Sequence, residues 1–97
     1  MPGVHRQGDE TQGHGCWPPQ VPSSWSPNVF ANGKPIVRQG DSRTPHTCPD
    51  IPETHGATYT GDSSVFVNGR PIQIRGSSLS CGDHAFACSG NVFAELL

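Results

Sequence analysis

The chain has few of the residues from which a small protein builds a core, and it has no long apolar run. Hydrophobic residues make up 32% of its 97 residues, with one Met and one Tyr. No stretch of about 18 apolar residues could span a bilayer, and no charged N-terminal region leads into an apolar stretch as in a secretory signal peptide. We therefore expect a single small domain, residues 1–97, whose core needs additional support.

Strong charge of either sign is also lacking. The formal net charge is −2, and the six Lys and Arg residues are scattered along the chain. Proteins that bind nucleic acid draw most of their affinity from phosphate neutralisation, so the chain is a poor candidate for this class and we expect no nucleic-acid partner. The sequence has no His-Glu-x-x-His motif and no paired Glu beside a His, as a catalytic zinc centre would need. We expect a protein that is not an enzyme.

Turn-forming residues, in contrast, are abundant, with 12 Gly and 10 Pro. This composition favours short strands over helices. Residues 29–36 (Val-Phe-Ala-Asn-Gly-Lys-Pro-Ile) return as residues 65–72 (Val-Phe-Val-Asn-Gly-Arg-Pro-Ile), and residues 91–95 are a truncated third copy. Asn-Gly after an apolar pair is a strong hairpin signal, because both residues tolerate a positive φ. Each copy therefore predicts a β-hairpin.

A second segment of the unit recurs as well. Arg-Gln-Gly-Asp occupies residues 6–9 and 38–41, and Arg-Gly-Ser at 75–77 is a degraded third copy. The chain therefore starts and ends in the middle of a unit, so its two ends are expected to complete one repeat together. We predict an all-β fold of three β-hairpin repeats with pseudo-threefold symmetry and little or no helix.

Each of these segments is followed by a loop that contains His or Cys. His14 comes five residues after Asp9, His46 comes five residues after Asp41, and Cys81 comes four residues after Ser77. Three equivalent loops would converge on the threefold axis at one end. Imidazole nitrogen and thiolate sulfur are the ligands of closed, structural zinc sites. We predict one structural Zn²⁺ bound by four side chains: His14, His46, His55 and Cys81.

Other roles remain open for the cysteines. Cys48 can replace His46 or His55 as a ligand, because His46 and Cys48 share a face of an extended segment. Four cysteines can also pair as disulfides, and Cys16, Cys48 and Cys88 can equally be small buried groups. His84 is a weaker alternative ligand.

The repeated unit resembles the proline-alanine-alanine-arginine (PAAR) repeat family, whose motif reads roughly Asn-Gly-x-Pro-Ala-Ala-Arg-x-Gly-Asp. Residues 35–41, Pro-Ile-Val-Arg-Gln-Gly-Asp, fit the motif with both alanines replaced, and residues 71–77 fit it more loosely. Residues 1–11 and the following His14-Gly15 resemble the N-terminus of the family. The resemblance covers essentially the whole chain and is weakest over residues 16–27 and 82–90.

The resemblance implies a small conical fold with zinc near its vertex, which caps a trimeric β-helical spike. Such spikes belong to contractile phage tails and type VI secretion systems, which pierce target membranes. The protein is thus expected at a virion tail tip or outside the cell. Residues expected to face the shaft, or to form the core instead, are Val29, Phe30, Val65, Phe66, Val92 and Phe93. The alternatives are a secreted binding module stabilised by disulfides or zinc and, less favoured, a zinc hydrolase.

Overall fold

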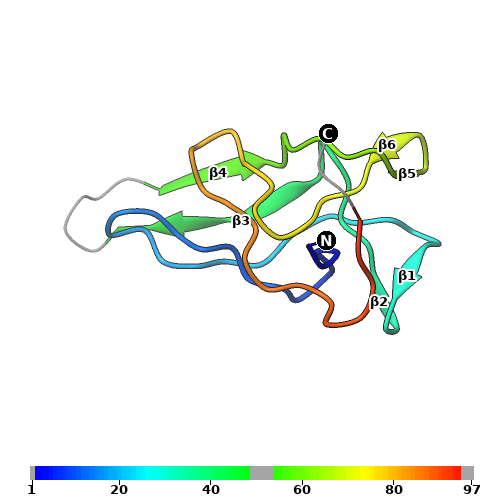
Figure 1. The fold of residues 1–97 in the computed structure, drawn as a ribbon. Helices are drawn as coiled ribbons and strands as arrows, with labels where there is room; N and C mark the ends of the chain where they lie inside the picture. Colours follow the sequence, from blue (N-terminus) through cyan, green and yellow to red (C-terminus); the bar gives the residue numbers. More distant parts are fainter. Residues whose placement is uncertain (1, 49–53, 95–97) are drawn as a thin grey trace.

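Short β-strands arranged as three antiparallel hairpins are the regular elements of the computed structural model (Figure 1). The structure describes residues 2–48 and 54–94. Within these ranges no helix is present, and accordingly none that could cross a bilayer. The predicted all-β fold is confirmed. The strands are β1 (Phe30–Ala31), β2 (Lys34–Pro35), β3 (Ser42–Thr47), β4 (Thr54–Thr58), β5 (Phe66–Val67) and β6 (Arg70–Pro71).

The two Asn-Gly units form the hairpins β1–β2 and β5–β6. Asn32 and Gly33 have φ angles of 55° and 76°, and Asn68 and Gly69 have nearly the same values, 54° and 76°. Positive φ at both central residues defines the tight turn that matches the twist of the flanking strands. Both hairpins are as predicted.

The third repeat is completed by the two ends of the chain. Gly3 forms an antiparallel bridge with Phe93. The Val4 amide donates to the Val92 carbonyl at 2.9 Å, just as Ile36 donates to Val29 and Ile72 to Val65 in the other two repeats. The predicted ring closure is therefore confirmed over the residues that the structure describes. Glu95, the last residue of the truncated copy, lies outside them.

A ring of three backbone hydrogen bonds marks the pseudo-threefold axis. The amide of Val37 donates to the carbonyl of His5, that of Gln73 to Val37, and that of His5 to Gln73, at 2.9–3.1 Å. All three residues are fully buried. Each unit thus forms a backbone hydrogen bond with both of the others, and the three bonds form a closed ring.

The third unit differs from the other two in its register. The sequence indicated a degraded copy in which Arg75 is shifted by one residue, and the hydrogen-bond pattern agrees, because it aligns Ile74 rather than Arg75 with Arg6 and Arg38. Where Arg6 and Arg38 pair with Asp9 and Asp41, Ile74 donates its amide to the Ser77 hydroxyl at 3.0 Å. Neither the Arg nor the Asp of this ion pair is present in the third unit, so no charge is left unpaired there.

The molecule is elongated, with extents of 38 × 24 × 22 Å. Hairpins β1–β2 and β5–β6 lie at one end, which we call the base, and β3–β4 runs towards the opposite end, the apex (Figure 1). Near the base, a core cluster contains Val4, Ile36 and Ile72, one from each unit. A second cluster around Val37 and Tyr59 lies beyond the first.

Candidate metal centre

Four side chains from three loops meet at the apex. The side-chain donor atoms of His14, His46, His55 and Cys81 all lie within 4.8 Å of one another. The Nε2 atom of His55 is 2.7 Å from that of His46 and 3.2 Å from that of His14. In a tetrahedral zinc site, neighbouring donor atoms lie roughly 3.3–3.6 Å apart. The set of donors and their spacing therefore suit a metal ion, and they are the four residues singled out by sequence.

The pairing of β3 with β4 brings two of these histidines together. His46 and His55 are direct cross-strand partners, next to an irregularity in register between Arg43 and His46. His46 is buried, and burial lowers the pKa of its imidazole. Its Nδ1–H donates to the carbonyl of Pro18 at 2.8 Å. A proton on Nδ1 leaves the Nε2 lone pair free to bind a metal, which is the usual support for a histidine ligand.

His14 is positioned by a tight turn. The backbone amides and carbonyls of His14 and Trp17 exchange two hydrogen bonds, and Gly15 between them has a φ of 56°. The indole of Trp17 stacks on the His14 imidazole with ring centroids 5.3 Å apart. The turn and the stacked ring together limit the directions in which the imidazole can point.

Behind the four clustered donors lies a buried ion pair that the sequence analysis missed. Arg43 and Asp83 have fully buried side chains, and Arg43 Nη1 is 2.7 Å from the carboxylate of Asp83. The same guanidinium donates to the Sγ of Cys81 at 3.4 Å and to the carbonyl of His55 at 3.2 Å. The Arg43 guanidinium thus contacts two of the four clustered residues. Arg43 is not part of any motif, so its contacts with the clustered residues could not be predicted from the sequence.

Asp83 ties this ion pair to the remaining loop. Its carboxylate accepts the amide of Gly13, the residue before His14, at 2.8 Å. Burial raises the pKa of Asp83, but hydrogen bonds from Thr11, the His84 amide, Arg43 and Gly13 outweigh it, so the pKa lies below its usual value of 3.8. Arg43 and Asp83 therefore connect loops of all three units just beneath the cluster.

Cys48 does not belong to the cluster, and its prediction as an alternative ligand was wrong. It forms a disulfide with Cys16, and their Cα atoms are 5.3 Å apart. Its sulfur is therefore not available as a thiolate ligand. Cys81 and Cys88 are free. The sequence analysis allowed for disulfides but did not assign which cysteines pair.

Two other histidines have roles outside the cluster. His5 is fully buried near the axis, where Nδ1 donates to the Ala87 carbonyl at 2.7 Å and Nε2 lies 2.9 Å from the Tyr59 hydroxyl. Burial lowers the pKa of His5 and raises that of Tyr59. His84 is exposed and is not among the clustered donors.

Large apolar side chains are exposed at the base. Phe30, Phe66 and Phe93, which are equivalent in the three units, are 54%, 58% and 49% exposed. The residues that follow them in the chain, Ala31, Val67 and Ala94, are buried in the core. Of the other expected base residues, Val65 and Val92 are exposed, whereas Val29 packs partly against the core.

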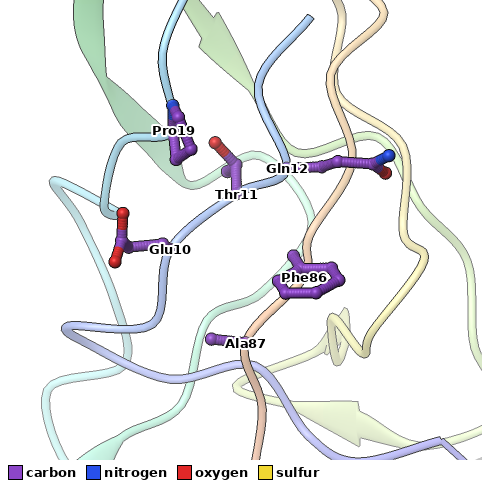
Figure 2. A pocket seen from close by; sticks show the side chains of 6 residues that line it. All are labelled: Glu10, Thr11, Gln12, Pro19, Phe86 and Ala87. Carbon is purple, nitrogen blue, oxygen red and sulfur yellow. The ribbon is translucent and has the colours of Figure 1, made fainter.

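One further exposed phenylalanine, Phe86, lies outside the repeated Val-Phe units. Phe86 is half exposed and borders a shallow groove that Glu10, Thr11, Gln12, Pro19 and Ala87 also line (Figure 2). The Arg75 guanidinium lies 4.7 Å from the centre of the Phe86 ring. Phe86 has no equivalent in the repeated Val-Phe unit, so it provides an exposed phenylalanine with which substitutions of the base phenylalanines can be compared.

Comparison with protein-family models matches residues 7–87 to the PAAR motif. The match spans the first Gly-Asp turn, both Asn-Gly hairpins and all four clustered donors. No curated protein sequence matches the chain.

Proposed function

Because the chain belongs to the PAAR motif family, a structural family of spike tips, we propose that it is the apex of a membrane-piercing spike in a contractile injection machine. In this role it caps the end of a trimeric β-helical shaft, in a phage baseplate or a type VI secretion system. The observation that supports this most directly is the arrangement of three quasi-equivalent units of one chain around an axis, with exposed aromatics at one end and clustered donors at the other.

The base suits a threefold partner. A trimeric shaft presents three copies of one surface at its end, and a single chain can match all three only if it repeats the same contact three times. Phe30, Phe66 and Phe93 are such a repeated contact. Exposed apolar side chains grouped on one face are typical of a protein interface rather than of free surface. The neighbouring hairpin backbones can extend the sheets of the shaft by strand addition.

At the apex, we propose that His14, His46, His55 and Cys81 bind one Zn²⁺. Three imidazoles and one thiolate are a donor set that zinc prefers, and four protein ligands make a closed, structural site. The ion, when bound, supplies a rigid junction between three loops where few side chains meet. The clustered donors include no carboxylate, and Asp83 nearby is engaged with Arg43. The site therefore suits a stabilising role better than that of a zinc hydrolase.

The alternative of a disulfide-framed binding module has one feature in its favour, the Cys16–Cys48 bond. That module predicts two disulfides and no metal. Cys81 instead lies among three histidines, and Cys88 is also free. The spike tip accounts for both the cluster and the threefold base.

Co-purification with a candidate trimeric β-helical shaft tests the proposal. We expect one tip chain per three shaft chains, and loss of the complex when Phe30, Phe66 and Phe93 are each replaced by Asp. Phe86→Asp is the matched control, since Phe86 is equally exposed but lies away from the base; this variant should still bind. Equal loss of binding in the control, or full binding by the triple variant, would contradict the proposed base.

A further inference from the structure

The two cysteines of the disulfide hold equivalent places in two of the three units. His14-Gly15-Cys16 and His46-Thr47-Cys48 are copies of one His-x-Cys element, 32 residues apart. The disulfide joins Cys16 to Cys48, a sequence separation of 32. It therefore connects two loops of the apex at the same position in each, two residues beyond a clustered histidine.

The segment that the disulfide anchors also contacts both histidines directly. Trp17 stacks on the His14 imidazole, and Pro18 accepts the Nδ1–H of His46 at 2.8 Å. Residues 16–18 are thus fixed to β3 through Cys48 and hold one imidazole from each loop. Breaking the bond would remove the covalent link between this segment and Cys48, and so weaken the support of two of the four donors.

We propose that the Cys16–Cys48 disulfide is a thiol–disulfide exchange site that sets the metal affinity of the apex. The inference rests on the proposed metal site. With the bond formed, the two loops are already held together, so metal binding orders less of the chain. With the bond reduced, the metal alone must bring His14 and His46 together. Metal and disulfide are then linked, and each stabilises the other by the same factor.

The exchange requires a dithiol reductant as co-reactant. Its thiolate attacks the Sγ of Cys16, because Cys16 is partly exposed whereas Cys48 is only 1% exposed. The S–S bond breaks, and Cys48 leaves as a thiolate. The second thiol of the reductant then displaces Cys16. Two electrons and two protons pass to the protein, which ends with two thiols, and the reductant ends as a disulfide.

Zinc affinity, measured by competition with a chromophoric chelator, tests the proposal. The metal-free protein is titrated in its oxidised form, and again after reduction and anaerobic removal of the reductant. We expect zinc binding to be weaker by roughly tenfold in the reduced protein, within the range typical of lost support around a ligand. The Cys16→Ser/Cys48→Ser variant should show the same loss, and Cys88→Ser, which removes the free thiol outside the cluster, should bind like the wild type.

Several results would overturn the proposal. Equal affinities of the oxidised and reduced forms would show that the disulfide does not set the affinity. Tighter binding after reduction, with a second thiolate visible in the Co²⁺ charge-transfer spectrum, would make Cys48 a ligand rather than a tether. If the oxidised protein bound no zinc, the proposed metal site would fail as well, so the two failures are distinguishable.

The reciprocal measurement needs no variant. The disulfide equilibrium is measured against a dithiol redox buffer, with the wild-type protein either loaded with zinc or metal-free. Roughly tenfold linkage shifts the equilibrium constant by the same factor, or about 30 mV in favour of the disulfide when zinc is present. An unchanged equilibrium would contradict the linkage.

Discussion

Arg43 is the residue whose importance is least visible in the sequence. Its guanidinium contacts Asp83, the Sγ of Cys81 and the backbone of His55, and the side chains of Arg43 and Asp83 are fully buried. A buried ion pair of this kind contributes little net stability compared with apolar residues, but loss of one partner leaves an uncompensated buried charge. Its effect on the apex is therefore to fix the position of the donors.

Replacing Arg43 by Met should destabilise the protein by about 3–5 kcal/mol, because the Asp83 carboxylate is left buried without its cation. Chemical denaturation measures this loss. The double variant Arg43→Met/Asp83→Asn, in which the buried group is neutral, should recover part of the stability. If Arg43→Met cost less than about 1 kcal/mol, the ion pair would not have the role assigned to it.

The buried His5 predicts a pH dependence. Its folded pKa lies below the usual 6.5, so its contribution to stability is complete above pH 6.5 and is lost as the pH falls through the lower folded value. The free energy of unfolding of the metal-free protein should therefore decrease on acidification from neutral pH. His46, whose pKa is also lowered, acts in the same direction.

The variant His5→Gln separates the two histidines. It should reduce the slope of unfolding free energy against pH below 6.5 by up to about 1.4 kcal/mol per pH unit, the value for one proton. Parallel slopes in the two proteins would mean that His5 does not titrate between the folded and unfolded states in this range.

At the scale of the elements, the hairpins show what a sequence of this kind can and cannot predict. The Asn-Gly pairs predicted both short hairpins because the requirement for positive φ is local. The register of the third unit also follows from the sequence, because residues 71–77 align with residues 35–41 without a gap and place Ile74 opposite Arg38, as the hydrogen bonds do. The partners of the Cys16–Cys48 disulfide could not be assigned from sequence, because the pairing depends on how two loops meet.

The turn requirement can be tested at Gly33. A Cβ at this position meets no atom within 4 Å, yet its φ is +76°. Gly33→Ala should therefore destabilise the protein by about 1 kcal/mol through backbone strain alone. Gly90→Ala is the matched control, since it also meets nothing within 4 Å and no positive φ is required there. Thermal denaturation that showed equal stability of the two variants would contradict this account.

At the scale of the whole molecule, the fold works as a closed ring with two different ends. The equivalent hydrogen bonds around His5, Val37 and Gln73 repeat the same contact three times. Three of the clustered donors, His14, His46 and Cys81, follow a repeated turn at nearly the same spacing, whereas His55 joins them through its pairing with His46 across β3 and β4. The supporting Arg43–Asp83 pair could not be predicted from sequence, because neither residue is part of the repeat.

The proposal of a zinc ion bound at the apex is tested most directly by X-ray absorption at the zinc edge of the purified protein. We expect three nitrogen neighbours at about 2.0–2.1 Å and one sulfur neighbour at about 2.3 Å, with no water in the first shell. A protein without zinc, or an ion with an oxygen neighbour or a second sulfur, would contradict a closed site made by His14, His46, His55 and Cys81.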